Sequence, residues 1–301
     1  MDIAIIGGGA WARALYAVLE PKSSVKIVSR SQHEGISQCS LQESASARFL
    51  IVAIASSALR GWLEQAKLPK DTRILAACKG IEEGSGALLS DIFEEFLPRE
   101  NLAYLAGPSF AKEVREGLPC ALTIHSYNRA LATEMASFFP THIRLYVDDD
   151  VIGGEVSGAY KNVIAIAGGI CDGLMLGANA KASLIARGLV EMARFGEHFG
   201  ARSETFLGLS GAGDLFLTSS STLSRNYRVG IGLAEGKSLE RILSELGEVA
   251  EGIKTAKAIT QIAKVRKIHA PIACEVHAIL EGKNPKESLR DLLSLGRVHS
   301  L

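Results

Sequence analysis

The sequence has little cysteine, no excess of charge of either sign and no long apolar run. Its five cysteines are scattered and odd in number, and none forms a Cys-x-x-Cys pair. This pattern argues against a disulfide framework or a structural zinc site and is typical of a reducing compartment. Lysine plus arginine and aspartate plus glutamate both number 33. The chain therefore has no overall field that would attract nucleic acid or an anionic membrane, and an anion must be held by local groups.

Signals for export, membrane insertion and metal binding are also lacking. Asp2 stands where a signal peptide would be basic, and the apolar run that follows ends at once in glycines. The most apolar stretch, 163–170, is too short to span a bilayer. The seven histidines are isolated, without the spacing of metal ligands. We predict a cytoplasmic protein without stable membrane association, nucleic-acid partner or bound metal.

The composition and the first half of the sequence predict an α/β domain. The chain has 301 residues, 47% of them hydrophobic and 22% charged, which is globular and long enough for two domains. A buried strand at 2–6, a glycine turn, a helical run at 12–19 and a second strand at 25–28 make a βαβ unit. Further strands are predicted at 49–54, 73–78, 103–106 and 120–124, and helical spacing occurs at 59–65 and 86–96. This alternation predicts a Rossmann-like, doubly wound sheet over residues 1–150.

The second half has almost no strand pattern. Long helical runs occur at 157–171, 180–199, 238–246 and 255–264. We therefore predict an all-α domain over residues 151–301, which would bind substrate and carry the catalytic groups. Its apolar helices favour a homodimer.

The glycine turn Gly7-Gly8-Gly9-Ala10-Trp11-Ala12 fits the pattern G-x-G-x-x-G/A. In that pattern Gly7 allows the tight turn, Gly9 lets a pyrophosphate approach the backbone, and Ala12 lets the helix pack on the strand. An isolated match is often only a tight strand-to-helix turn. Here the turn follows the first predicted strand and opens a helix, which favours a dinucleotide site.

The second strand ends at Ser29-Arg30, where NAD-binding domains usually carry an acidic residue for the ribose 2′-hydroxyl. An arginine there can pair with a 2′-phosphate or stack on adenine. The alternative is a solvated loop arginine. We expect the cofactor to be NADPH or NADH, with NADPH accepted.

A lysine and an asparagine, Lys161 and Asn162, lie in an otherwise apolar helical run. Lysine is almost never fully buried unless it is paired, and burial lowers its pKa into the range of an acid/base catalyst. A lysine that extends from the helix edge to solvent fits the pattern equally well.

Two other groups of candidates follow predicted strands. Lys79 ends the fourth strand, and Gly107 and Ser109 end the fifth. In open parallel sheets ligands bind beyond the carboxyl ends of the strands, so these residues suit contact with a substrate. The alternatives are a solvated loop charge for Lys79 and a helix N-cap for Ser109.

Polar clusters also occur in the helical half. Asp214 ends a second glycine-rich stretch and can orient Lys161, or cap the next helix. Ser224-Arg225-Asn226 offers a hydroxyl, a guanidinium and an amide that suit a phosphate. Taken alone, a capping cluster at the surface is the more common meaning of such a triplet.

Together these segments resemble the bacterial-type NAD(P)-dependent glycerol-3-phosphate dehydrogenase family. The resemblance is carried by GGGAWARAL from Gly7, CKG at Cys78, AGPSFAKEV from Ala106, GAYKNVIAIAGGICDGLMLGANAKASLIARGLVEM from Gly158, GLSGAGDLFLT from Gly208, LSRNYRVG from Leu223 and VAEGIKTA from Val249. These motifs follow the family's order over nearly the whole chain. One departure is the segment between Arg30 and Phe49, which is shorter than the family's usual excursion and flanks the adenosine end.

The resemblance implies a role for each matching residue. It implies that Lys161 donates and accepts the proton and that Asp214 binds substrate beside it. The implied substrate contacts are Lys79, Gly107, Ser109, Asn162, Asp214, Ser224, Arg225 and Asn226. The implied cofactor contacts are Gly7, Gly9, Ala10, Trp11, Ala12, Arg30, Lys79, Ala111, Arg225, Val249 and Glu251.

The expected reaction is NAD(P)H-dependent, reversible reduction of dihydroxyacetone phosphate to sn-glycerol 3-phosphate, feeding glycerophospholipid synthesis. One alternative is a related dehydrogenase of the 3-hydroxyacid or 6-phosphogluconate type. Another is a non-catalytic nucleotide sensor on the same fold.

Overall fold

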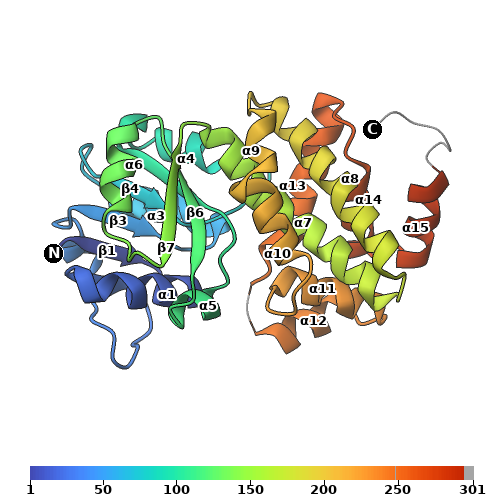
Figure 1. Cartoon of the computed structure of the whole chain (residues 1–301), viewed down its shortest axis with the longest axis horizontal. Coiled ribbons are helices and arrows are strands. Elements are labelled where there is room, and N and C mark those ends of the chain that lie inside the picture. The colour runs from blue at the N-terminus through green and yellow to red at the C-terminus, as the bar shows by residue number, and fades with distance from the viewer. Residues whose placement is uncertain (248, 295–301) are drawn as a thin grey trace. The chain divides into compact units, whose positions relative to one another are not determined.

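The computed structural model describes residues 1–247 and 249–294. By contacts the chain divides into two compact units (Figure 1). The first unit comprises Met1–Lys79 and Ala87–Glu155, and the second comprises Gly80–Gly86 and Val156–Leu301. Residues 248 and 295–301 of the predicted second domain lie outside the described residues.

A seven-stranded sheet organises the first unit, and its order is β2-β1-β3-β4-β5-β6-β7. The strands are β1 (Ile3–Ile6), β2 (Val25–Val28), β3 (Phe49–Val52), β4 (Ile74–Ala76), β5 (Leu102–Ala106), β6 (Cys120–His125) and β7 (Ile143–Asp148). The first five run parallel, whereas β6 is antiparallel to β5 and β7 is parallel to β6. The chain order reverses between β2-β1 and β1-β3, so the Rossmann-like, doubly wound class is confirmed.

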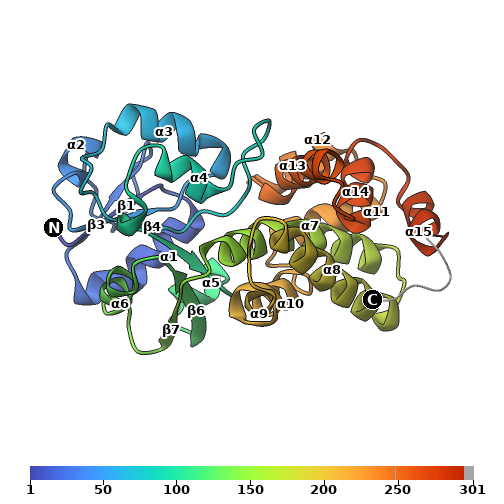
Figure 2. The ribbon, with the colours of Figure 1, turned by 90° about the horizontal axis from the view of Figure 1, so that it is seen from above.

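Helices cover both faces of this sheet (Figure 2). One core cluster joins the sheet to α1 (Ala10–Leu19), α5 (Ala111–Arg115) and α6 (Arg129–Ala136). The other joins it to α3 (Leu59–Ala66) and α4 (Leu89–Glu94). The remaining short elements are η1 (Glu20–Lys22), α2 (Leu41–Ser44), η2 (Ser56–Ala58) and η3 (Arg99–Asn101). Strands covered on both faces must be apolar along their whole length, as the predicted runs are.

The short segment between β2 and β3 contains no full strand. Gln38 forms a single parallel bridge to Ile27 on the outer side of β2, and α2 follows. As a result, β2 is the outermost full strand of the sheet, and the loop after it is folded against its outer side.

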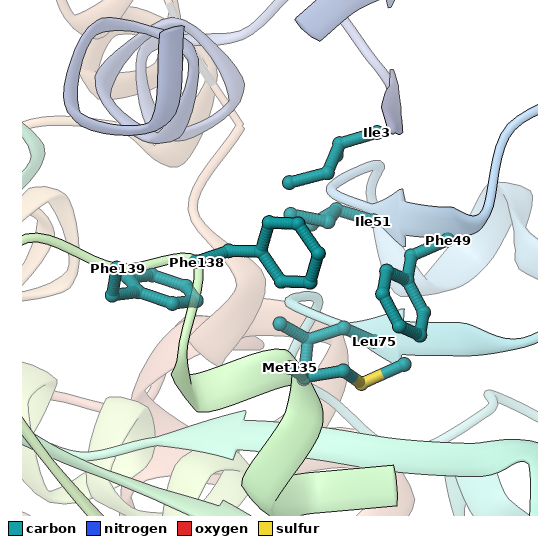
Figure 3. A pocket seen from close by; sticks show the side chains of 7 residues that line it. All are labelled: Ile3, Phe49, Ile51, Leu75, Met135, Phe138 and Phe139. Atoms are coloured by element: carbon teal, nitrogen blue, oxygen red, sulfur yellow. The ribbon is translucent and has the colours of Figure 1, made fainter. Parts of the chain in front are cut away.

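Figure 3 shows a small pocket in the core of the first unit. Its lining is Ile3, Phe49, Ile51, Leu75, Met135, Phe138 and Phe139. Phe49 and Phe138 pack edge to face with ring centroids 5.3 Å apart. Because no polar or titratable side chain lines this pocket, we assign it no catalytic role.

The second unit is built from helices. They are α7 (Val151–Gly173, its first turn counted with the first unit), α8 (Ala178–Glu197), α9 (Ser203–Leu207), a π-helical turn η4 (Leu209–Gly213), α10 (Asp214–Thr218), α11 (Arg225–Ala234), α12 (Leu239–Leu246), α13 (Glu251–Arg266), α14 (Pro271–Leu280) and α15 (Pro285–Ser294). Residues 156–171 of α7 are all buried, so a helix without a polar face forms the centre of this unit.

Helices α7 and α11 touch through glycines. A Cβ atom on Gly169 would collide with the carbonyl oxygen of Tyr227, and one on Gly230 would collide with that of Ile166. Their main chains therefore lie in direct contact, and α11 is held in a fixed register against the helix that carries Lys161.

Among the residues that the structure describes, no helix is long and apolar enough to cross a membrane. Within the same residues, no three or more histidine, cysteine, aspartate or glutamate side chains are grouped so that they could hold a metal ion.

The first turn of α7 provides a pH-dependent contact. The Glu155 carboxyl accepts hydrogen bonds from the backbone N–H of Ser90 at 2.8 Å and from its hydroxyl. Burial raises the pKa of Glu155 from 4.5 to about 8, although the bonds from Ser90 act in the opposite direction. The folded protein thus keeps a proton that the unfolded chain loses at lower pH.

Between about pH 5 and 8 this proton makes stability fall as the pH rises, by up to about 1.4 kcal/mol per pH unit. Glu155→Gln cannot ionise and keeps a donor and an acceptor for Ser90. We expect the variant to have a flatter dependence of the free energy of unfolding on pH, measured by urea denaturation. The exposed Glu116→Gln is the control, and equal slopes in wild type and Glu155→Gln would contradict the assignment.

Candidate functional site

The glycine turn connects β1 to α1. Gly7 has a φ of +125°, and a Cβ there would lie 2.5 Å from the carbonyl oxygen of Ala53, so only glycine fits. Gly9 is the N-cap of the ten-residue α1, whose first turn has no acidic residue. Apart from Gly9 and its chain neighbours, no atom lies within 4 Å of where a Gly9 Cβ would stand. The start of α1 is therefore uncrowded on this side, which fits the approach of a dinucleotide pyrophosphate to the N–H groups of a helix N-terminus.

The other residues of the turn differ in exposure. Ala12 is fully buried, and Trp11 is partly buried against the sheet cluster. Ala10 and Arg30 are exposed. The small side chain of Ala12 thus serves the packing of α1, whereas Ala10 and Arg30 are accessible to a ligand.

The first-unit candidates beyond the turn follow neighbouring strands. Lys79 comes after β4 and is half-buried, and Gly107 comes after β5 with a φ of +113°. Because β1, β3, β4 and β5 are parallel, their carboxyl ends share one edge. The glycine turn, Lys79 and Gly107 therefore lie along one edge of the sheet.

Ser109 is not a helix N-cap. Its hydroxyl donates to the carbonyl of Gly107 at 3.2 Å, and α5 starts at Ala111 after an N-cap at Phe110. Ser109 therefore stabilises the turn after β5, and Ala111 opens the short helix that follows.

Lys161 is buried in the middle of α7 and is paired. Only 8% of the residue is exposed, so it does not extend to solvent. Its ammonium donates to Oδ1 of Asp214 at 2.6 Å and to Oγ1 of Thr218 at 2.9 Å. These contacts fix the position of Nζ within the second unit.

Asp214 and Thr218 are placed by α10. Asp214 follows the π-helical turn η4 and is 1% exposed. The N-cap of α10 is Gly213, not Asp214. The Thr218 hydroxyl donates to Asp214 Oδ1 at 3.1 Å across four residues, which is one helical turn. Thr218 was missing from the predicted residues, and its spacing from Asp214 was the available signal.

Two candidate site residues, Asn162 and Asn226, are joined by a hydrogen bond. Asn226 Nδ2 donates to Asn162 Oδ1 at 2.9 Å, and Asn226 Oδ1 accepts from the backbone N–H of Gly252 at 2.9 Å. A Cβ on Gly252 would lie 2.7 Å from both the Asn162 carbonyl oxygen and Asn226 Oδ1. Asn226 thus joins α7, α11 and α13, and Gly252, which the sequence did not single out, permits the contact.

Ser224 and Arg225 begin α11. The Ser224 hydroxyl accepts from the backbone N–H of Tyr227 at 3.2 Å, so it caps the helix, although it does so as a buried residue and not in a cluster at the surface. Arg225 is exposed while Ser224 and Asn226 are buried. Val249 is 54% exposed, and Glu251 is the first residue of α13.

A second polar cluster anchors α11. Lys181 and the Tyr227 hydroxyl both donate to Asp172 Oδ2, and the Lys181 ammonium lies 5.0 Å from the Tyr227 ring centroid. Burial, then the bond to Asp172, raises the pKa of Tyr227 to about 12. Tyr227 therefore stays a neutral donor that ties α11 to the end of α7.

A doubly wound sheet with a dinucleotide-type glycine turn, joined to a helical unit with a buried lysine–aspartate pair, defines a class: Rossmann-fold dehydrogenases with a helical second domain. Two family models agree. Residues 33–132 match the N-terminus, and residues 150–290 the C-terminus, of NAD-dependent glycerol-3-phosphate dehydrogenase. The chain belongs to this family.

Individual relatives cover almost the whole chain. A glycerol-3-phosphate dehydrogenase [NAD(P)+] from Wolinella succinogenes is 79% identical over 99% of this chain and 100% of its own length. One of the same name from Helicobacter hepaticus is 57% identical over 97% and 99%. The crystal structure of glycerol-3-phosphate dehydrogenase from Coxiella burnetii has a TM-score of 0.91 at 33% identity, covering 97% of this chain and 98% of that one.

Proposed function

We propose that the protein catalyses the NAD(P)H-dependent, reversible reduction of dihydroxyacetone phosphate to sn-glycerol 3-phosphate. The observation that carries this proposal is the buried Lys161–Asp214–Thr218 cluster in a chain of the glycerol-3-phosphate dehydrogenase family. Burial of an ammonium and a carboxylate costs desolvation free energy, so such a pair usually acts on a ligand or fixes the fold.

The proposed chemistry uses Lys161 as the proton donor. When bound at the glycine turn, the dinucleotide supplies a hydride to the carbonyl carbon. Lys161 Nζ gives its proton to the carbonyl oxygen as negative charge develops there. Asp214 and Thr218 hold Nζ in place, and Asp214 stabilises its charged form before the transfer. Reversal of these steps oxidises the alcohol.

The phosphate is proposed to bind at the start of α11. Arg225 offers an exposed guanidinium, which matches phosphate oxygens in a two-pronged contact. Asn226 has both its oxygen and one Nδ2 hydrogen engaged in the protein, which leaves the other hydrogen for the ligand. Ser224, Asn162, Lys79, Gly107 and Ser109 are the remaining proposed substrate contacts.

The proposed cofactor contacts fall into two sets. Those of the first unit are Gly7, Gly9, Ala10, Trp11, Ala12, Arg30, Lys79 and Ala111, and those of the second are Arg225, Val249 and Glu251. Fit of the first set rests on the open space beside Gly9.

The test is the absorbance of reduced nicotinamide. Purified protein is mixed with NADPH or NADH and dihydroxyacetone phosphate, and in parallel with unphosphorylated dihydroxyacetone. We expect oxidation only with the phosphorylated ketone. Turnover of 3-hydroxyacids or 6-phosphogluconate instead would favour the related dehydrogenases. Cofactor binding without turnover on any phosphorylated triose would favour a nucleotide sensor.

The setting of the reaction is also proposed. Scattered cysteines favour the cytoplasm, and glycerol 3-phosphate made there would feed phospholipid synthesis. A homodimer is proposed from the apolar helices of the second half, and light scattering of the purified protein tests it.

Gly252 provides a prediction about the substrate site. Gly252→Ala forces a methyl group against Asn162 and Asn226, so Asn226 must shift away from its bonding position. We expect KM for dihydroxyacetone phosphate to rise roughly tenfold, about the effect of one lost hydrogen bond to a charged group. Steady-state kinetics measures it. The control is Gly61→Ala in α3, where no atom lies within 4 Å of the new Cβ; equal KM values in the two variants would contradict the proposed position of Asn226.

A further inference from the structure

The main chain that carries Asp214 is short and irregular. Asp214 follows the five-residue π-helical turn η4 and opens α10, which also has five residues. Such turns are rare and occur frequently at functional sites. The turn is closed by a bond from the Gly213 N–H to the Gly208 carbonyl at 3.1 Å. Because few helical hydrogen bonds hold this segment, the position of the Asp214 carboxylate depends on what the turn packs against.

Gly211 joins this turn to the main chain of α9. A Cβ atom on Gly211 would lie 2.1 Å from the carbonyl oxygen of Phe206 and 2.4 Å from its Cα atom. Ordinary van der Waals contact begins at 3.4 Å, so only glycine allows this approach of the two main chains. The carbonyl of Gly211 accepts the backbone N–H of Asp214. Through one glycine, Phe206 therefore limits where the main chain of Asp214 can lie.

The other end of Phe206, its ring, lies on α8. Phe206 is fully buried, and a Cβ on Gly196 of α8 would lie 2.2 Å from its Cζ atom. The helices α9 and α10 both lie beside α8 (Figure 2). One phenylalanine thus fills the space between the main chain of α8 and the turn that leads to Asp214.

The helix that carries Lys161 is packed against the same elements. A Cβ on Gly188 of α8 would lie 2.8 Å from Cγ2 of Ile164, three residues after Lys161 in α7. A Cβ on Gly168 of α7 would lie 2.9 Å from the carbonyl oxygen of Ser219, at the end of α10. Because protein interiors are close-packed, pressure between α8 and η4 is expected to displace the short turn and not the long helices α7 and α8.

We propose that Phe206, acting through Gly211, is a positioning residue for the Lys161–Asp214 pair. The inference rests on the proposed function, in which Lys161 gives its proton to the ketone. Phe206 sets the position of the turn, and the turn sets that of the Asp214 carboxylate. This carboxylate accepts from Lys161 Nζ at 2.6 Å. Phe206 thereby keeps Nζ at the place from which the proton is transferred, without touching substrate or cofactor.

The first experiment displaces the Phe206 ring from the side of α8. Gly196→Ala puts a methyl group 2.2 Å from Cζ, so the ring must move until ordinary contact is restored. A misplacement of about 1 Å can cost about 100-fold in rate, and we expect kcat for dihydroxyacetone phosphate to fall at least about tenfold. KM should stay nearly unchanged, because the proposed phosphate contacts at the start of α11 are not displaced. Unchanged kcat in folded Gly196→Ala would overturn the proposal.

A compensating variant tests the path through the ring. Phe206→Leu removes Cζ and both Cε atoms and leaves a gap, so alone it should also lower kcat. In Gly196→Ala/Phe206→Leu the new methyl group fills that gap, and most of the lost kcat should return. A folded double variant that recovers none of it would overturn the role of Phe206.

The control reproduces the collision elsewhere in the second unit. Gly232→Ala in α11 puts a methyl group 2.7 Å from Cγ1 of Ile242 in α12, and kcat should not change. Circular dichroism shows that each variant is folded. Equal losses of kcat in Gly232→Ala and Gly196→Ala would make the effect a general one of crowding and would also overturn the proposal.

A second measurement does not depend on the reaction. Gly196→Ala is added to the wild type and to Lys161→Met/Asp214→Leu, which lacks both charges of the pair. We expect it to lower the urea midpoint of unfolding more in the wild type, because only there does the displacement disturb an ion pair. Equal shifts in the two backgrounds would overturn the proposal. Unequal shifts in a protein that does not reduce dihydroxyacetone phosphate would reject the proposed function and leave the positioning of the pair standing.

Discussion

Lys161→Met is expected to lower kcat for dihydroxyacetone phosphate at least about 100-fold, because a positioned acid/base contributes about 10² to 10⁴ in rate. Methionine keeps the length and apolar stem of lysine in a site that is 8% exposed. It lacks only the proton and the charge. The measurement is kcat at saturating cofactor and ketone.

The control for this variant is Lys237→Met. Lys237 belongs to a surface ion-pair cluster with Glu235 and Glu245, so its loss should leave kcat unchanged. Circular dichroism and binding of adenosine 5′-monophosphate show that both variants are folded. A folded Lys161→Met protein with full turnover would reject Lys161 as the proton donor.

Asp214→Ala is expected to be the most destabilising of these changes. The Asp214 side chain is 1% exposed and that of Lys161 10%, so removal of the carboxylate takes away a charged partner of a buried ammonium. Breaking a buried pair in this way typically costs about 3–5 kcal/mol. Urea unfolding measures the loss.

A double variant distinguishes two causes of the stability loss, the removal of the charged partner of Lys161 and the removal of the packing of the Asp214 side chain. In Lys161→Met/Asp214→Leu both charges of this pair are removed, so we expect the double variant to recover much of the stability that Asp214→Ala loses. Glu245→Ala, at an exposed ion pair, serves as the control and should change stability little. If Asp214→Ala were as stable as the wild type, Asp214 would not be holding a buried ammonium.

The apolar pattern located six of the strands but not their directions. Each of β1, β3 and β5 is buried at every residue, so a continuous apolar run located them. β6 is antiparallel to β5, which periodicity does not encode because both directions have the same repeat. β7 was missed because it alternates: Arg144 and Tyr146 are exposed, so it lacks the continuous run of a strand covered on both faces.

One helix was predicted too long. The pattern predicted a helix over 86–96, whereas α4 spans Leu89–Glu94. Gly86 has a φ of +73° and lies against Ile262, and Glu83 pairs with Lys257 at 2.6 Å. Residues 80–86 thus belong to the second unit and pack with α13, a long-range contact that outweighs local helical spacing.

The sequence identified candidate site residues but did not predict which of them contact one another. Lys161 and Asp214 are 53 residues apart, and Asn162 and Asn226 are 64 apart, so no local pattern shows that they meet. For this reason burial and solvent exposure of Lys161 looked equally plausible from the sequence. Thr218 and Gly252 become candidate site residues only through those same contacts.

The contact between Gly169 and Gly230 has a consequence for engineering this protein. At either position a side chain would collide with a carbonyl group of the neighbouring helix. A second mutation cannot remove this collision, because every residue type has the same main-chain carbonyl. The distance between α7 and α11 is therefore set by the dimensions of the two main chains and does not depend on side-chain rotamers. If the start of α11 binds the substrate phosphate as proposed, a redesign for a larger or smaller anion has to change side chains there, such as Arg225, because the helix itself cannot be moved.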